Sequence, residues 1–276
     1  MAPAAPDRRL TPFSGRHALE CLRGQVEAEF VAGEQGAVAV PLADLEAQPG
    51  GARDRQVMLG EPLVVVEWRG GHAFVQMGKD GYCGWLAAGA VGPEVAATHW
   101  VAAAGTHLYP APRVQARAIA ALPFGARLAV AEADAKWARV VGGFVPAMHL
   151  RRLGDWFDDP VAVAELFVGT PYLWGGNSRD GIDCSGLVQA ALTGCGRACP
   201  GDSDLQAALG VQVAEGAALD RGDLIFWKGH VALVEGPDLI LHANGHSMDV
   251  RFEGLSAAIA RIAAQGGGPV TARKRV

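Results

Sequence analysis

The stretch Gly181-Ile-Asp-Cys-Ser-Gly186 decides the fold, because it joins a glycine-rich loop to a helical pattern. Apolar residues at 187, 188, 191 and 192 lie on one side of a helix predicted from about Ser185 to Gly194–Gly196. Asp183 would cap this helix, and Cys184 would lie in its first turn. Unpaired N–H groups and the helix dipole favour a negative charge there, so we expect the Cys184 thiol to ionise readily and act as a nucleophile.

The segments around this helix predict helices first and strands afterwards. Asp159-Pro160 opens a helix with an N-cap acid and a proline, and Ser203-Asp-Leu-Gln206 predicts a capping box at the start of another. Strands are predicted over 224–227, 231–234, 239–243 and 248–252, followed by an amphipathic helix over 256–264. This order predicts an α+β domain over residues 154–276.

A cysteine nucleophile needs a base, and His230 and His242 are the informative candidates. They lie on neighbouring predicted strands, on either side of a Gly236-Pro237 turn. We expect them to share a face by pairing directly opposite each other, which sets Val234 against Asp238 across a loop of odd length. The alternative for each histidine alone is an ordinary surface or core position.

The N-terminal half is predicted to form short strands cut by Gly and Pro, in a pattern that repeats. Residues 60–76 match 125–140, and the DGYCGW stretch at 80–85 falls where 142–147 falls, so that Tyr82 matches Phe144. Two small β-barrels fit best, at residues 31–95 and 96–153, after an extension at 1–30. Coincidence among apolar strands is the alternative.

Composition excludes several classes of function. The 276 residues carry a net charge of −5 with no basic run beyond Arg273-Lys-Arg275, which argues against nucleic-acid binding. Five cysteines argue against a closed disulfide framework. The absence of an apolar leader and of a run of about 20 apolar residues predicts a cytoplasmic protein without membrane contact. We expect no metal and no cofactor, since the Asn244-Gly245 turn separates His246 from His242. Oligomeric state is left open.

Five motifs occur in an order typical of a known family, namely Pro171-Tyr-Leu-Trp-Gly-Gly176, Asp183-Cys-Ser-Gly186, Arg221-Gly-Asp-Leu224, Gly229-His-Val231 and His242-Ala-Asn244. Residues 155–276 thereby resemble the NlpC/P60 cysteine peptidases, whose fold is papain-like, and the DGYCGW stretch resembles bacterial SH3-type (SH3b) barrels. The resemblance implies that Cys184 is the nucleophile, His230 the general base and His242 the residue that orients it. It also implies that Tyr172 lies near the nucleophile, where it would help the Cys184 N–H form an oxyanion hole.

A narrower resemblance is to the SH3b-bearing γ-D-glutamyl-L-diamino acid endopeptidases of cell-wall recycling. It implies a peptidoglycan-derived peptide as substrate, free L-Ala-γ-D-Glu-diaminopimelate, cut after the glutamate. Asp202 and Ser203 would then hold the free amino end, and Tyr82 of the first barrel would close the pocket. Asp183 and Ser185 would line the ligand site. The alternatives are that Asp202, Ser203 and Asp183 are helix caps and that Tyr82 packs the barrel.

Two other functions are compatible with the same residues. The first is an amidase or acyltransferase of the same fold acting on another amide. The second is a non-catalytic protein that binds cell-wall fragments through its barrels.

Overall fold

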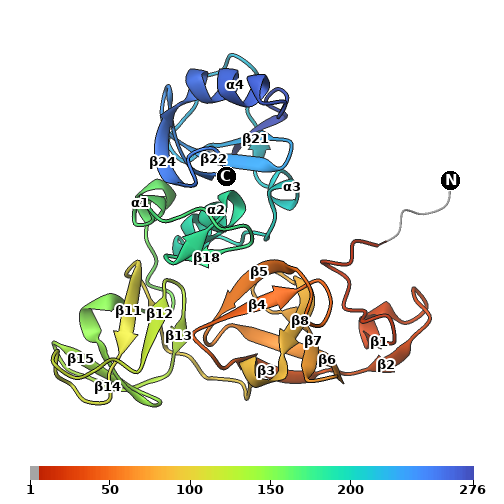
Figure 1. The fold of residues 1–276 in the computed structure, drawn as a ribbon, viewed down its shortest axis with the longest axis vertical. Coiled ribbons are helices and arrows are strands. Elements are labelled where there is room, and N and C mark those ends of the chain that lie inside the picture. The colour runs from red at the N-terminus through yellow and green to blue at the C-terminus, as the bar shows by residue number, and fades with distance from the viewer. Residues whose placement is uncertain (1–5) are drawn as a thin grey trace. The chain divides into compact units, whose positions relative to one another are not determined.

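The computed structural model describes residues 6–276, which divide into two compact units, Met1–Leu153 and Gly154–Val276 (Figure 1). Within the described residues, no helix is long and apolar enough to cross a membrane. The four-part division at 1–30, 31–95, 96–153 and 154–276 remains a prediction.

The first unit opens with a parallel pair of strands, β1 (His17–Leu19) and β2 (Glu29–Val31), joined through the 3-10 turn η1 (Glu20–Leu22). Leu19 and Val31 of this pair pack against a buried cluster of the following barrel that includes Cys83. The backbone N–H of Cys83 also donates to the carbonyl of Arg9. Residues before the barrel are therefore tied to it by apolar contacts and a backbone hydrogen bond.

The first barrel is a seven-stranded antiparallel sheet in the order β5-β4-β8-β7-β6-β3-β9. Its strands, with one 3-10 turn, are β3 (Glu34–Val38), β4 (Leu42–Glu46), β5 (Arg53–Met58), β6 (Pro62–Arg69), β7 (His72–Met77), β8 (Cys83–Ala87), η2 (Ala88–Ala90) and β9 (Val91–Gly92). Alternate side chains point inward, and Leu45, Leu63 and Leu86 are among the fully buried ones.

The second barrel has three small sheets in the orders β13-β10-β17, β11-β12 and β14-β15-β16. Its elements are β10 (His99–Val101), β11 (Gly105–Leu108), β12 (Ala120–Pro123), β13 (Arg127–Leu128), β14 (Val130–Ala133), β15 (Trp137–Val140), β16 (Gly143–Pro146), η3 (Ala147–His149) and β17 (Leu150–Arg152). The predicted repeat is visible in the ladders. The β6–β7 pair shifts register between Val65 and Glu67, and the β14–β15 pair shifts between Val130 and Glu132. Such bulges raise the local twist that closes a small barrel.

The predicted match of Tyr82 with Phe144 is wrong. In the first barrel Phe74 pairs with Trp85, and in the second Arg139 pairs with Phe144, so Phe144 occupies the position of Trp85. The connection between β7 and β8 runs over 78–82, whereas that between β15 and β16 is only 141–142. Tyr82 thus lies in a connection that is longer than its counterpart in the second barrel. An alignment of the two repeats by motif spacing alone does not reveal this difference in length.

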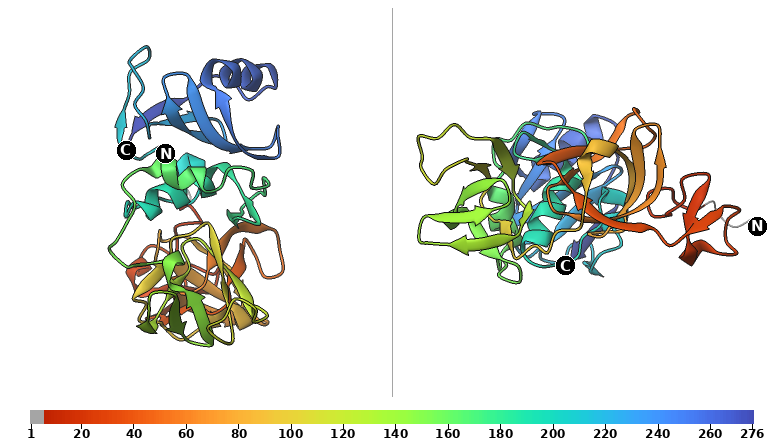
Figure 2. Two further views of the ribbon diagram at one scale, coloured as in Figure 1. Left: turned by 90° about the vertical axis from the view of Figure 1, so that its left-hand side faces the viewer. Right: turned by 90° about the horizontal axis from the view of Figure 1, so that it is seen from below.

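The second unit places helices on both faces of a six-stranded sheet with the order β20-β25-β21-β22-β23-β24 (Figures 1 and 2). Its strands are β20 (Val211–Gln212), β21 (Leu224–Trp227), β22 (His230–Gly236), β23 (Leu239–Asn244), β24 (Asp249–Gly254) and β25 (Ala272–Arg275), with a separate hairpin of β18 (Asn177–Ser178) and β19 (Gly181–Ile182). Its helices are α1 (Pro160–Glu165), α2 (Cys184–Gly194), α3 (Ser203–Gln206) and α4 (Leu255–Ala264).

The two faces of this sheet bury different residues. Ala232, Val234 and Ile240 form one cluster with Leu255 and Ala258 of α4. Helices α1 and α2 pack on β22 and β23 from the other side (Figure 2). This is the α+β order predicted from the sequence. The basic Arg273-Lys-Arg275 segment, which the sequence presents as a tail, is strand β25 and pairs with β21 inside the sheet.

Candidate functional site

Cys184 is the first residue of α2, as predicted, and Asp183 caps the helix. Asp183 Oδ1 accepts hydrogen bonds from the Gly186 N–H at 2.7 Å and from the Ser185 hydroxyl at 2.9 Å, while Oδ2 accepts from the Gly175 N–H at 2.8 Å. The Asp183 carboxylate therefore fixes the loop, the cap and the first turn relative to one another.

The glycines of the two flanking motifs are needed for close approach. A Cβ at Gly186 would lie 2.5 Å from the carbonyl oxygen of Gly176, and one at Gly176 would lie 2.4 Å from that of Gly181. A side chain at either position would push the loop away from the start of α2. The motif glycines therefore set the position of Cys184 through backbone packing.

The expectation that the Cys184 thiol ionises readily is wrong for the unliganded protein. The pKa of this thiol is raised to about 12, mainly by burial and also by the neighbouring Asp183 carboxylate. The backbone N–H groups of Val231, Ser185 and Cys184 itself lower the pKa, but less. A helix N-terminus stabilises a thiolate by only about 1 kcal/mol in most settings, and removing the thiolate from water costs more.

His230 and His242 lie side by side, with His230 Nε2 2.9 Å from His242 Nδ1. The predicted register is wrong, however. Val234 pairs with Ile240 instead of Asp238, and the hairpin turn is Pro237-Asp238 with an irregularity next to it at Glu235. A slip of two residues keeps the same face, so the two imidazoles meet diagonally across the strands.

Both imidazoles are neutral over the physiological range. The pKa of His230 is lowered to about 3, mainly by burial and also by the neighbouring His242 and Arg261. Burial likewise lowers the pKa of His242 to about 4, against the opposing effect of Glu253. The resting site is therefore a neutral thiol near a neutral histidine pair, in which His230 can serve as a proton acceptor.

Two polar residues contact the far nitrogen of His242, and neither was predicted as a site residue. Glu253 Oε2 lies 3.0 Å from His242 Nε2, and Asn244 Nδ2 lies 3.1 Å from the same atom. A signal for Glu253 was present in the sequence, since Asp249, Arg251 and Glu253 alternate at strand spacing and hence share a face. His242 itself is fully buried.

Tyr172 lies close enough to Cys184 and Asp183 for their charges to act on it. Burial raises the pKa of its phenol above the ordinary value, and the neighbouring Cys184 and Asp183 raise it further. Its backbone N–H donates to the carbonyl of Met248 at 2.9 Å, which ties this loop to the turn after β23. The phenol is therefore a neutral hydrogen-bond donor near Cys184.

Asp202 occupies the N-cap position of α3, and Ser203 is the first residue of that helix. The predicted capping box is wrong, because Gln206 is fully buried and turned inward. Its Nε2 donates to the carbonyls of Ser185, at 2.9 Å, and Pro200, at 3.0 Å. Gln206 thereby ties the segment that carries Asp202 and Ser203 to the residue that follows the nucleophile.

Tyr82 belongs to the core cluster of the first barrel and is 2% exposed. The Arg55 guanidinium lies over its ring at 5.1 Å, and the Tyr82 N–H donates to Asp80. This is the environment expected of a packing residue, and the role of Tyr82 in closing a substrate pocket remains a prediction.

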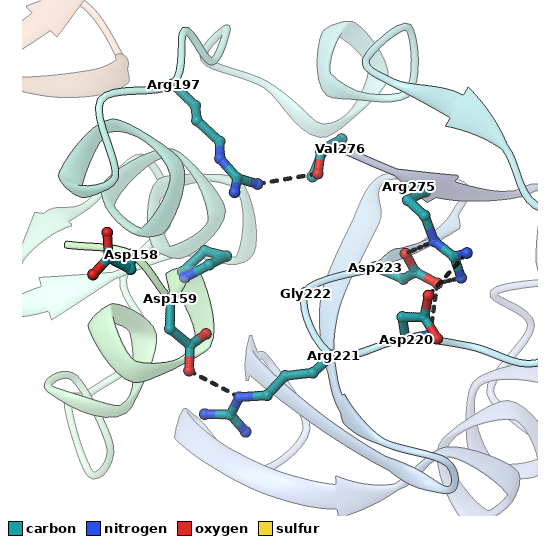
Figure 3. A pocket seen from close by; sticks show the side chains of 10 residues that line it. Asp158, Asp159, Arg197, Asp220, Arg221, Gly222, Asp223, Arg275 and Val276 are labelled. Carbon is teal, nitrogen blue, oxygen red and sulfur yellow. Dashed lines mark hydrogen bonds and ion pairs between the residues drawn. The ribbon is translucent and has the colours of Figure 1, made fainter. Parts of the chain in front are cut away.

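A separate pocket of about 400 Å³ lies in the second unit (Figure 3). It is lined by Asp158, Asp159, Pro160, Arg197, Asp220, Arg221, Gly222, Asp223, Arg275 and Val276. Its arginines have acceptors, Arg221 with Asp159 and Arg275 with Asp223. The pocket is built from residues other than the predicted catalytic ones.

Comparison with known proteins finds similarity in both units. Residues 169–261 match the NlpC/P60 family, and residues 46–91 match the bacterial dipeptidyl-peptidase SH3 domain. Dipeptidyl-peptidase 6 of Lysinibacillus sphaericus is 35% identical over 36% of this chain and 36% of its own length. Gamma-D-glutamyl-L-lysine dipeptidyl-peptidase of Bacillus cereus is 37% identical over 31% and 28%. The chain spans about a third of the length of these curated relatives.

A solved structure has the same fold along most of the chain. An NlpC/P60 family protein from Bacillus cereus superposes with a TM-score of 0.73 over 88% of this chain and 99% of its own, at 21% identity. The two chains therefore share a fold, an α+β domain together with SH3-like barrels. The chain is thus similar to the NlpC/P60 family over residues 169–261 and to the bacterial dipeptidyl-peptidase SH3 domain over residues 46–91.

Proposed function

We propose that this protein is a cysteine endopeptidase that hydrolyses the bond between γ-D-glutamate and the diamino acid of peptidoglycan stem peptides. The observation that carries the proposal is the 2.9 Å contact between His230 and His242, beside a cysteine at the first turn of α2. A thiol, a base and a residue that orients the base are the parts that acyl transfer through a thioester requires.

The reaction follows from the resting protonation state. As Cys184 attacks the γ-glutamyl carbonyl, its proton passes to His230, since neither group is charged beforehand. The oxyanion is stabilised by N–H groups at the start of α2, with the Tyr172 hydroxyl as a further donor. His230 then protonates the departing amine, and water attacks the thioester with His230 again as the base. The dipeptide acid leaves and the thiol is restored.

The substrate end is proposed to be recognised by Asp202 and Ser203. A free ammonium that leaves water needs a carboxylate partner, and Gln206 ties this segment to the nucleophile turn. Tyr82 is proposed to complete the pocket from the first barrel. A free L-Ala-γ-D-Glu-diamino acid peptide, as released during cell-wall recycling, would fit these groups.

The proposal also specifies which diamino acid follows the glutamate and in which compartment the protein acts. The Bacillus relatives carry names that specify L-lysine, whereas diaminopimelate is the residue that we first expect. All five cysteines are free, which suits a reducing compartment, and we propose that the protein acts in the cytoplasm.

The test is a competition in one vessel between free L-Ala-γ-D-Glu-diaminopimelate, its L-lysine counterpart and the muramyl-capped form of each. Mass spectrometry follows all four peptides, with a Cys184→Ala variant as the control. Loss of the free peptides alone, dependent on Cys184, is the expected result. Cleavage of capped peptides would remove the role of Asp202, and no cleavage by wild type would favour a binding protein or an enzyme that acts on another amide.

A further inference from the structure

Two charged residues, Glu253 and Arg261, lie on the side of His242 that faces away from His230. His242 Nε2 lies 3.0 Å from Glu253 Oε2, and Arg261 holds Glu253 from the opposite side. We propose that Glu253 is a positioning residue that sets the tautomer of His242 and so the direction of the His242–His230 hydrogen bond. This inference rests on the proposed function of the same site.

The direction of that hydrogen bond decides whether His230 can act as a base. A neutral imidazole has one donor and one acceptor nitrogen. Because His230 Nε2 faces His242, Nδ1 is the nitrogen left to take the thiol proton, and it must be unprotonated. Nε2 of His230 then carries the hydrogen and donates it to His242 Nδ1. His242 must in turn carry its proton on Nε2.

The two neighbours of His242 Nε2 favour opposite tautomers. The Glu253 carboxylate accepts and so favours a proton on Nε2, whereas Asn244 Nδ2 is a donor and favours an unprotonated Nε2. The Asn244 amide is held in this orientation, because its Oδ1 accepts from the N–H groups of His246 and Ser247 and from the Ser247 hydroxyl. A hydrogen bond to a charged acceptor is about twice as strong as a neutral one, so Glu253 determines the tautomer.

Arg261 keeps Glu253 ionised and in place. Its Nε donates to Glu253 Oε1 at 2.8 Å and its Nη2 to Oε2 at 2.7 Å, and this guanidinium lowers the pKa of the carboxyl below its ordinary value. Glu253 lies on β24, opposite Ile240 and diagonal to His242 on the same face. Arg261 lies on α4, whose apolar side packs on that face. The arrangement thus depends on three elements brought together by the core.

The experiment replaces the carboxylate by an amide of the same shape. In Glu253→Gln, the side chain loses its charge and one of its two acceptor oxygens, so it no longer outweighs the Asn244 donor, and the His242 tautomer should shift toward a proton on Nδ1. We expect kcat for the free tripeptide to fall about 10- to 100-fold, as for other residues that act through a catalytic group, with KM changed less than twofold. Glu235→Gln is the matched control, because Glu235 lies at the other end of β22 in an ion pair with Arg221 at 2.9 Å.

Nitrogen-15 NMR of the histidine side chains supplies a readout that needs no activity. The wild type should show His242 protonated on Nε2, and Glu253→Gln should show it protonated on Nδ1. Arg261→Lys, which keeps the charge but loses the paired contact, provides a second variant and should give a mixture of the two tautomers. An unchanged tautomer in both variants, or a kcat within twofold of wild type, would overturn the inference. A wild type without peptidase activity but with the expected tautomers would refute the proposed function and leave the role of Glu253 standing.

Discussion

Two buried cysteines, Cys184 in the second unit and Cys83 in the first barrel, show how little burial alone says about chemistry. Each has an aspartate nearby, and burial raises the pKa of each thiol to about 12. Around Cys184 the backbone N–H groups of Val231 and Ser185 oppose that rise. His230, which precedes Val231 in the chain, forms a pair with His242. Around Cys83 the neighbouring Asp80 and Cys21 add to the rise.

The aspartates next to these two cysteines, Asp183 and Asp80, also differ in the groups that they contact. Asp183 accepts from backbone N–H groups and organises the start of a helix. Asp80 pairs with Arg55 at 2.5 Å, with both side chains at least 94% buried, and so stabilises the barrel. The comparison teaches that what a buried polar group does is set by its partners. Substitutions at these positions and at Tyr82 distinguish the two kinds of environment.

The largest difference is expected between the alanine variants of Cys184 and Cys83, because one should lose activity and the other only some stability. Cys184→Ala should lower the rate of peptide hydrolysis by about 10⁴-fold or more, because no other group can form the thioester. Cys83→Ala should leave kcat within twofold and cost about 1 kcal/mol of stability as a small apolar truncation. Steady-state kinetics and urea unfolding of the two variants make the measurement. Equal losses of activity would show that the barrel position also serves catalysis.

Removal of the barrel aspartate should affect stability alone. Asp80→Ala removes the carboxylate that lies 2.5 Å from the buried Arg55 guanidinium, and we expect the free energy of unfolding to fall by about 3–5 kcal/mol. Glu20→Ala, which breaks an exposed pair with Arg23, is the control and should cost less than about 1 kcal/mol. Chemical denaturation of the intact chain measures both. A loss below 1 kcal/mol for Asp80→Ala would mean that the pair is not a stabilising element.

Thiol alkylation should find both buried cysteines unreactive at neutral pH. A raised pKa leaves less thiolate, so Cys184 and Cys83 should react with iodoacetamide at pH 7 about 100-fold more slowly than the exposed Cys21. The rates of Cys184 and Cys83 should each rise about tenfold per pH unit up to pH 10, since only the thiolate reacts. Peptide mapping of the alkylated sites gives the three rates. Rapid reaction of Cys184 at pH 5 would instead reveal a thiolate–imidazolium pair formed before substrate binds.

The smallest expected effect concerns Tyr82. If its hydroxyl contacts the substrate, Tyr82→Phe should raise KM for the free tripeptide about fivefold, the value of one hydrogen bond, without change in kcat. Tyr109→Phe in the second barrel is the matched control and should leave KM unchanged. Kinetics on the free and muramyl-capped peptides provide the measurement. An unchanged KM would assign Tyr82 to the barrel core, where its ring is 2% exposed.

Much of the second unit could be predicted from the sequence, because its signals are local. Asp183 as a cap, Cys184 at the start of a helix and the strands around His230 and His242 follow from residue type and spacing. The predictions of strand register and of the match between the two barrels were wrong, because both depend on how separate strands pair. A bulge at Glu235 moved the register by two residues, and a longer connection around Tyr82 displaced the match between the barrels.

Residue type and short-range periodicity in the sequence are enough to place Cys184 at the start of a helix, His230 and His242 on neighbouring strands, and helices before strands. Only the tertiary structure decided that Glu253 and Arg261 meet His242, that Gln206 reaches the carbonyl of Ser185, and that the thiol is neutral at rest. The physical reason is that hydrogen-bond partners from separate elements, and the loss of water around a charge, exist only once the core has packed.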